Sequence, residues 1–100
     1  TVLAYGDIEL DREKRRVARS GRPIDLGPTE YRLLEFFLEH PGRVFSRTRI
    51  LNQVWGYSED PLTNVVDVYI ARLRRKIDTP GREPLLETVR GHGYRLRAAA

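Results

Sequence analysis

Residues 63–78, with the sequence TNVVDVYIARLRRKID, combine helical periodicity with a single apolar stripe and a face rich in arginine. At about 100° per residue, four apolar side chains fall within one narrow sector, as in the buried stripe of a helix. These are Val66, Ile70, Leu73 and Ile77. The opposite side of the helix carries Asn64, Val68, Ala71, Arg72 and Arg75. The segment therefore predicts an amphipathic helix with one stripe in the core and a basic face in solvent.

The helix alone leaves two interpretations of this basic face open. Arginine can bond guanine, asparagine can bond adenine, and small apolar groups can contact the thymine methyl, so the mixture suits a helix in the DNA major groove. The simpler interpretation is an amphipathic surface helix with a basic end. Both are equally well supported until the rest of the chain is considered.

The composition indicates one soluble domain. One hundred residues with 40% hydrophobic content suffice for a single core. The absence of cysteine excludes disulfides and thiolate metal sites, and the two histidines, His40 and His92, lack carboxylates at ligand spacing. No apolar run approaches the ~20 residues of a membrane span, and no signal peptide is recognisable. We expect a cytoplasmic domain with no membrane contact, no metal, no cofactor and no catalytic residues.

The charge distribution favours a polyanionic partner. Lys and Arg number 18 against 14 Asp and Glu, which gives a net charge of +4. Acidic residues concentrate in 7–13 and 30–39, whereas the second half carries most of the positive charge, in 72–76 and at Arg82, Arg90, Arg95 and Arg97. In the first half, Arg12, Arg15, Arg16 and Arg19 could meet phosphate, but outward-facing strand positions are the favoured role.

Four short strands and a helix are predicted in the first 40 residues. Strand patterns cover 2–5, 8–11, 16–20 and 22–25, with turns between them, so a small antiparallel sheet is expected. A helix begins at Gly27-Pro28 and ends before Pro41-Gly42, because Pro suits the first helical position. Its buried side chains are expected to be Leu33, Leu34, Phe37 and Leu38, and His40 is expected to cap its last carbonyls.

Two further helices and a hairpin complete the prediction. Ser46 is the expected N-cap of a helix that extends to about Gln53, with Gly56 after it and Ile50, Leu51 and Val54 facing inward. A loop over 57–62 separates it from the basic helix. Strands over 86–90 and 94–97, joined by Gly91-His92-Gly93, form a β-hairpin. The predicted fold is α+β, a winged helix-turn-helix with an N-terminal four-stranded antiparallel sheet, three helices and a C-terminal hairpin wing.

Several segments are similar to one family, the DNA-binding effector domain of OmpR/PhoB-type response regulators. The similarity covers nearly the whole of residues 1–100, and the order and spacing of the separate blocks make it specific. The blocks are LGPTEYRLL (26–34), VFSR (44–47), VWG (54–56), VDVYIARLRRK (66–76) and TVRGHGY (88–94).

The resemblance implies a set of DNA contacts. Base contacts are implied for Asn64, Val65, Val68 and Arg72, of which all but Val65 lie on the polar face of the basic helix. Backbone contacts are implied for Thr29, Trp55, Tyr69, Arg74, Thr88 and Tyr94, and we expect a further one at Arg75. The wing arginine, Arg90, is implied to enter the adjacent minor groove.

The resemblance also implies partners. It implies an N-terminal receiver domain, which is absent from these residues. The chain starts at Thr1 and contains no methionine, so we expect a fragment of a longer protein or a processed chain. A sensor kinase would phosphorylate that receiver, and two effector domains would associate in tandem on direct-repeat promoter sites. RNA polymerase, through its sigma or alpha subunit, would contact the loop that includes Tyr57, Ser58, Glu59 and Asp60.

Departures from the family pattern and rival functions complete the expectations. Ala71 stands where many relatives have arginine, and Tyr69 where histidine is frequent, so one phosphate contact is expected to be lost. Asp67 could accept from cytosine or hold Arg74, and the structural role is favoured.

The rival function is a basic interaction module that binds an acidic protein or RNA. The deep, narrow major groove of A-form RNA, however, suits a protein that reads with a helix and a wing poorly.

Overall fold

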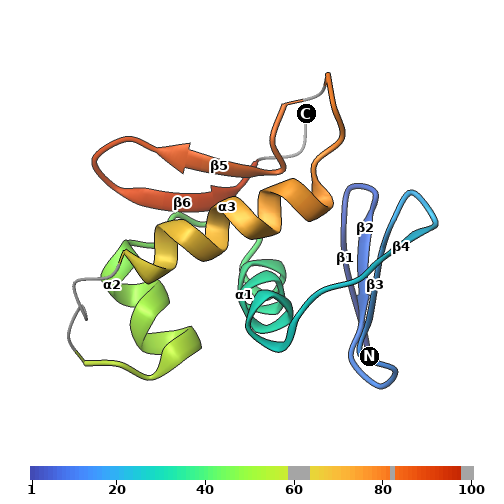
Figure 1. The fold of residues 1–100 in the computed structure, drawn as a ribbon, viewed down its shortest axis with the longest axis horizontal. Helices are drawn as coiled ribbons and strands as arrows, with labels where there is room; N and C mark the ends of the chain where they lie inside the picture. Colours follow the sequence, from blue (N-terminus) through green and yellow to red (C-terminus); the bar gives the residue numbers. More distant parts are fainter. Residues whose placement is uncertain (59–63, 82, 98–100) are drawn as a thin grey trace.

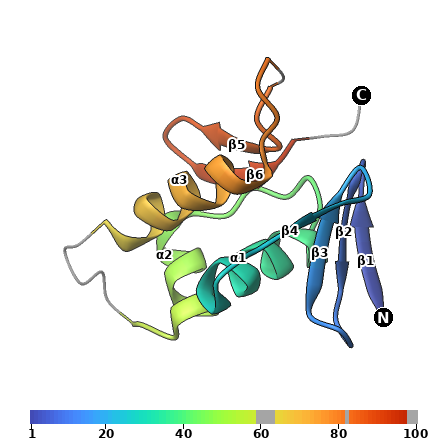
Figure 2. The same cartoon turned by 45° about the vertical axis from the view of Figure 1, so that its right-hand side comes forward.

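The structure is a computed structural model that describes residues 1–58, 64–81 and 83–97. Helix α3 crosses the middle of the molecule, with the hairpin along it, α1 beneath it and the N-terminal sheet to one side (Figures 1 and 2). The elements in chain order are β1 (Val2–Tyr5), β2 (Ile8–Asp11), β3 (Arg16–Arg19), β4 (Arg22–Ile24), α1 (Pro28–Glu39), α2 (Arg47–Ile50), η1 (Leu51–Trp55), α3 (Val65–Ile77), β5 (Leu86–Val89) and β6 (Gly93–Leu96). The predicted winged-helix fold, with its four-stranded sheet and wing, is confirmed.

The N-terminal sheet has the strand order β1-β2-β3-β4, with every neighbouring pair antiparallel. Its inner face contributes three buried side chains, Ile8, Leu10 and Val17, to the core. The two from β2 alternate with more exposed residues along that strand, as expected for a sheet with one face on the core.

The outward-facing role predicted for the sheet arginines is wrong for Arg19. Its side chain is only 11% exposed and pairs with Asp7 at 3.0 Å, and it donates to the Ile77 carbonyl at 2.6 Å. Because Ile77 ends α3, this arginine fastens the sheet to the end of that helix. Arg12 likewise pairs with Glu39 of α1 at 2.7 Å. Both arginines therefore join elements instead of facing outward.

Helix α1 begins as predicted, but His40 does not cap it through its ring. The backbone N–H of His40 donates to the Phe37 carbonyl at 3.1 Å. The imidazole instead packs edge-on against Phe36 and Phe45, with ring centroids 5.4 and 5.2 Å away. The aromatic neighbours provide more contact for the ring than the exposed carbonyls of the last turn.

The second helix extends further than predicted. Ser46 caps it by accepting a hydrogen bond from the Arg49 N–H at 3.1 Å, as expected. A turn of π-helix, η1, then continues the chain to Trp55, and Gly56 ends it with a φ of 76°. The three predicted inward side chains, Ile50, Leu51 and Val54, are all buried.

The wing is joined to the body of the domain by backbone pairing. β5 and β6 pair antiparallel, and the Phe45 N–H donates to the Tyr94 carbonyl at 2.9 Å, while the Tyr94 N–H donates to the Phe45 carbonyl at 3.0 Å.

The four predicted stripe residues of α3 are all buried in the core, at 5% exposure or less. The position of α3 is thus determined by packing along its whole length. None of the described helices is long and apolar enough to cross a membrane.

The carboxylate of Glu30 connects α1 to α3. The side chain accepts from the Gly27 N–H at 2.8 Å and from Lys76 Nζ at 2.6 Å, and the residue is only 5% exposed. Burial by itself raises the pKa of Glu30, but the hydrogen bonds from Lys76 and Gly27 outweigh it and hold the pKa below its ordinary value of 4.5.

This lowered pKa predicts a loss of stability in acid. A carboxyl with a lower pKa in the folded state stabilises the fold above its unfolded pKa, and the contribution disappears as the pH falls through the folded pKa. Glu30→Gln is therefore expected to cost about 1.5–3 kcal/mol near neutral pH, as for a hydrogen bond to a charged group. The difference from the wild-type free energy of unfolding should shrink below the ordinary pKa of 4.5. Urea titrations at several pH values, with the exposed Glu9→Gln as control, measure this; a difference independent of pH would contradict the assignment.

Candidate nucleic-acid interface

The face of α3 that was predicted to be polar is exposed. Asn64 lies just before the helix in the left-handed region, with a φ of 50°, and its side chain faces solvent. Val68 is 44% exposed. Ala71 and Arg75 are exposed as well, and the side chain of Arg72 also lies at the surface, whereas Val65 is half-buried. The mixture of donors and apolar groups that suits base edges is therefore available to a ligand.

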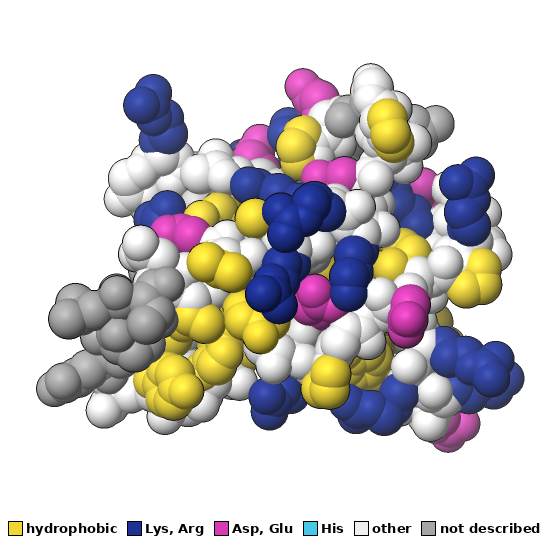
Figure 3. All heavy atoms as spheres, viewed as in Figure 1, with side chains coloured by type: hydrophobic (Ala, Val, Ile, Leu, Met, Phe, Trp, Pro, Cys, Tyr) yellow, Lys and Arg dark blue, Asp and Glu magenta, His cyan; other side chains and the backbone are white. Residues whose placement is uncertain are grey.

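Lys and Arg side chains gather over α3 in the middle of one face of the molecule and at the tip of the wing (Figure 3). Arg90 is exposed in the turn between β5 and β6. The hairpin lies along α3 and extends past it, so the helix and the wing tip present their cations on the same side. This arrangement fits an extended polyanion that meets both elements.

Aromatic side chains support the exposed face of α3. The rings of Trp55 and Tyr69 meet edge to face, with centroids 5.5 Å apart, and the Arg72 guanidinium lies over the Tyr69 ring at 5.0 Å. Trp55 is half-buried and both rings pack against the core, so each combines packing with access to solvent. Thr29, in the first turn of α1, lines the same shallow hollow as Tyr69 and Arg72.

Arg74 has partners within the domain. Its guanidinium donates twice to the Leu86 carbonyl, at 3.0 and 2.9 Å, and once to Thr88 Oγ1 at 2.7 Å. This arginine therefore fastens α3 to β5. Thr88 is exposed and uses its oxygen as an acceptor here, so its hydroxyl proton remains free to donate outward. A phosphate contact by Arg74 stays a prediction, and it would have to share the guanidinium with β5.

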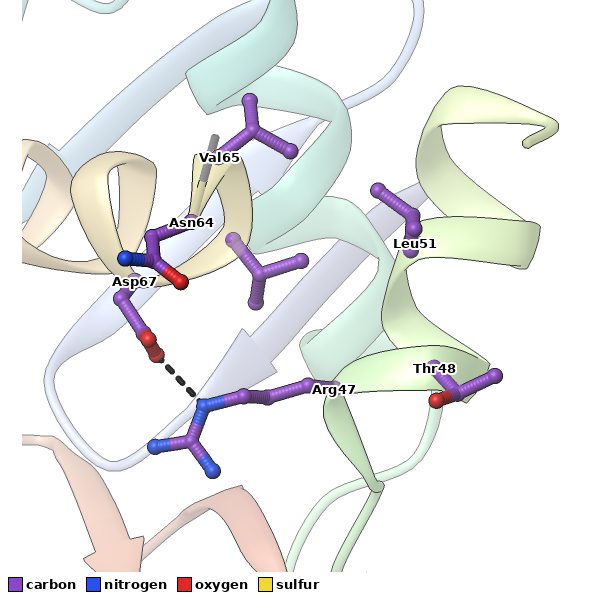
Figure 4. A pocket seen from close by; sticks show the side chains of 7 residues that line it. Arg47, Thr48, Leu51, Asn64, Val65 and Asp67 are labelled. Carbon is purple, nitrogen blue, oxygen red and sulfur yellow. Dashed lines mark hydrogen bonds and ion pairs between the residues drawn. The ribbon is translucent and has the colours of Figure 1, made fainter. Parts of the chain in front are cut away.

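The structural role expected for Asp67 holds, but its predicted partner was wrong. The carboxylate accepts from Arg47 Nε at 2.7 Å (Figure 4). It also accepts from the Tyr94 hydroxyl, and not from Arg74. Burial raises the pKa of Asp67, but the hydrogen bonds from Tyr94 and Arg47 outweigh it and lower the pKa below the ordinary range. Asp67 is thus a carboxylate held between α2 and the wing. Arg74 is directed instead to β5, where the Leu86 carbonyl accepts from it.

The hydroxyl of Tyr94 is occupied in this arrangement. Tyr94 is 5% exposed, donates to Asp67, and has the guanidinium groups of Arg47 and Arg74 at 5.1 and 5.5 Å from its ring. Burial, followed by the bond to Asp67, raises the pKa of this phenol, so it remains a neutral donor at ordinary pH. A phosphate contact by the hydroxyl would require its bond to Asp67 to break.

Arg47 belongs to the site although sequence reasoning did not select it. It begins α2, and its side chain is half exposed beside the start of α3. Arg47 and Asp67 are 20 residues apart, so no local pattern relates them. Only the packing of α2 against α3 brings them together.

In the loop predicted to face the polymerase, Tyr57 and Ser58 are exposed, while Glu59 and Asp60 lie outside the described residues.

The comparisons with known proteins agree with this geometry. Residues 21–96 match the family described as "Transcriptional regulatory protein, C terminal". The chain belongs to this family. It is 49% identical over 98 residues to the phosphate regulon transcriptional regulatory protein PhoB of Rhizobium meliloti, in an alignment that covers 98% of this chain and 43% of that protein. The family expectation from the sequence is confirmed, and the chain spans about two-fifths of the length of this curated relative.

Solved structures of family members match the whole domain. The DNA-binding domain of CpxR from E. coli has a TM-score of 0.85 at 31% identity, with 100% of this chain and 99% of that chain covered. The DNA-binding domain of RstA from Klebsiella pneumoniae, solved in complex with the RstA box, has a TM-score of 0.86 at 29% identity, with 96% of each chain covered. The family's C-terminal domain thus accounts for the sheet, the three helices and the wing.

Proposed function

We propose that this domain binds double-stranded DNA in a sequence-specific manner and regulates transcription as the output domain of a two-component response regulator. The observation that carries the proposal is the exposed face of α3, where the donors of Asn64, Arg72 and Arg75 lie beside the apolar Val68. This combination suits direct readout in the major groove. The wing arginine, Arg90, lies in the turn of the hairpin beside it and suits the adjacent minor groove.

The contacts divide into base readout and backbone positioning. Asn64, Val65, Val68 and Arg72 are proposed to face base edges. Thr29, Trp55, Tyr69, Arg75 and Thr88 are proposed to face phosphates, and Arg74 and Tyr94 would join them only by sharing or releasing their internal partners. The preferred sequence is best identified by selecting bound duplexes from a random pool.

Substitution of two neighbouring arginines tests this division. Arg72→Ala is expected to cost about 1–3 kcal/mol on the selected duplex and to relax the choice at one base pair, as for a bidentate guanine contact. Arg75→Ala is expected to weaken all duplexes alike and to lower the slope of the salt dependence by about one. Binding titrations on the selected and scrambled duplexes measure both effects. Equal losses on both duplexes for both variants would reject the base contact of Arg72.

The whole protein is proposed to work through partners outside this domain. An N-terminal receiver domain, phosphorylated by a sensor kinase, would control the pairing of two effector domains. RNA polymerase would contact the loop that begins at Tyr57 and Ser58. The relatives named above are transcriptional regulators, which supports a non-enzymatic role in the bacterial cytoplasm.

The arrangement of the DNA sites gives a further prediction. We expect the isolated domain to be largely monomeric in solution and to gather in two copies on direct repeats, because the N-terminal sheet and the wing are different surfaces that can meet head to tail without a two-fold axis. Sedimentation of the free domain and footprinting on direct-repeat and palindromic duplexes test this. Preference for the palindrome would reject the tandem arrangement and leave DNA binding intact.

A further inference from the structure

The aromatic ring of Tyr69 contacts both Trp55 and Arg72. The Trp55 ring meets the Tyr69 ring edge to face at 5.5 Å, and the Arg72 guanidinium lies 5.0 Å from the centre of the Tyr69 ring. Trp55 and Tyr69 both pack against the hydrophobic core, whereas Arg72 is exposed. The contacts therefore run from Trp55 in η1 through Tyr69 to Arg72 on the exposed face of α3. Packing against the core holds Trp55 and Tyr69 in place.

The Tyr69 ring is an aromatic contact of the Arg72 guanidinium, and the Glu30 carboxylate interacts with the same guanidinium electrostatically. Among the described residues, Arg72 forms no ion pair. Glu30 lines the same hollow as Arg72, and its Oε1 accepts from Lys76 at 2.6 Å and from the Gly27 N–H, but no hydrogen bond or ion pair joins it to Arg72. A guanidinium held over an aromatic ring by a cation–π contact forms no conventional hydrogen bond there, so its N–H donors are not taken up by an acceptor atom of the ring. Tyr69 thus restrains the side chain without occupying the groups that a guanine would need.

We propose that Tyr69 is a positioning residue for base readout, whose ring holds the Arg72 guanidinium ready for a bidentate contact. The inference rests on the proposed function of Arg72. An arginine loses rotamer entropy when it binds, and restraint before binding reduces this loss. The backbone contact proposed for the Tyr69 hydroxyl is a separate role, because the hydroxyl would affect every duplex equally whereas the ring would affect one base pair.

Two substitutions separate the ring from the hydroxyl. The quantity to measure is the affinity for the selected duplex divided by the affinity for a second duplex. The second duplex differs only at the base pair whose preference Arg72→Ala weakens. Tyr69→Leu removes the ring, and the ratio is expected to fall about two- to fivefold, the range of an exposed cation–π interaction. Tyr69→Phe keeps the ring and is expected to weaken both duplexes alike while the ratio is retained. In the Arg72→Ala background, Tyr69→Leu should change the ratio no further.

A measurement on the free domain makes the test independent of DNA. The Arg72 Nε–H resonance is expected to show a ring-current shift that Tyr69→Phe keeps and Tyr69→Leu removes. If Tyr69→Leu retains the ratio, or if Tyr69→Phe lowers it as much as Tyr69→Leu does, the positioning role is overturned. If Arg72→Ala leaves the sequence preference at every base pair unchanged, the proposed base contact of Arg72 is rejected instead. The resonance shift still reports whether the Tyr69 ring holds the guanidinium.

Discussion

Gly93→Ala is expected to destabilise the domain by roughly 2–6 kcal/mol, the sum of a strained backbone conformation and an overpacked contact. Gly93 has a φ of 139°, a region that side-chain-bearing residues rarely adopt. A Cβ atom at this position would lie 1.9 Å from the Phe45 carbonyl oxygen and 2.9 Å from the Ser46 Cα. Both neighbours are backbone, so the wing would have to leave its pairing with the segment before α2.

Gly91 provides the matched control for this experiment. It lies two residues earlier, in the turn before β6, with a φ of 76°, but a Cβ atom added to it would meet no other atom within 4 Å. Gly91→Ala should therefore cost only about 1–2 kcal/mol, the penalty of a left-handed residue. Urea titrations of the two variants give the comparison, and equal midpoints would show that the close approach of Gly93 to Phe45 does not stabilise the wing. Loss of folding in Gly93→Ala alone would agree with the expectation.

The second large effect is expected in the salt dependence of DNA binding. If Arg75, Arg90 and other basic side chains of this face neutralise about four phosphates at one half-site, the slope of log K against log salt is about −3.6. Affinity should then fall on the order of 100-fold between about 50 and 200 mM salt. Counterion release is the physical reason, because each neutralised phosphate frees a condensed cation. Titrations of one half-site over a salt series measure the slope.

The variants that separate base from backbone contacts also calibrate this slope. Arg90→Ala and Arg75→Ala should each reduce its magnitude by about one, whereas Val68→Ala, which changes no charge, should leave it unaltered while affecting the choice of base. An affinity independent of salt would reject the electrostatic footprint and favour a protein partner. A salt-dependent affinity for duplex RNA equal to that for DNA would instead favour the RNA alternative.

Much of the fold could be predicted because it depends on local patterns. The period of Val66, Ile70 and Leu73 identifies the buried stripe of α3, and all three are buried. The Ser46 cap and the turn at Gly91 mark the ends of their elements in the same local way. The exposed face of α3 follows from the same periodicity, since a helix with one buried stripe must present the opposite side to solvent.

The partners of the polar side chains could not be predicted in this way. Arg19 was expected to face solvent, yet it bonds the Ile77 carbonyl, and Asp67 was expected to hold Arg74, yet it bonds Arg47. The bond of Arg74 to the Leu86 carbonyl was not foreseen either, although its phosphate contact stays a prediction. Each of these contacts joins different elements of the fold. Periodicity assigns a side chain to a face, but many donors on other elements compete for one carbonyl or carboxylate.

The sequence by itself therefore determined the order of the elements, the buried stripe and the basic face of α3, because these follow from local backbone preferences and the spacing of apolar residues. The tertiary structure alone decided which arginines remain free for a ligand. Among the described residues Arg72 forms no ion pair and is exposed, whereas Arg74 and Arg47 are bound to the wing and to Asp67. Hydrogen bonds depend on distances of a few tenths of an ångström, and only the packing of α2, α3 and the wing sets those distances.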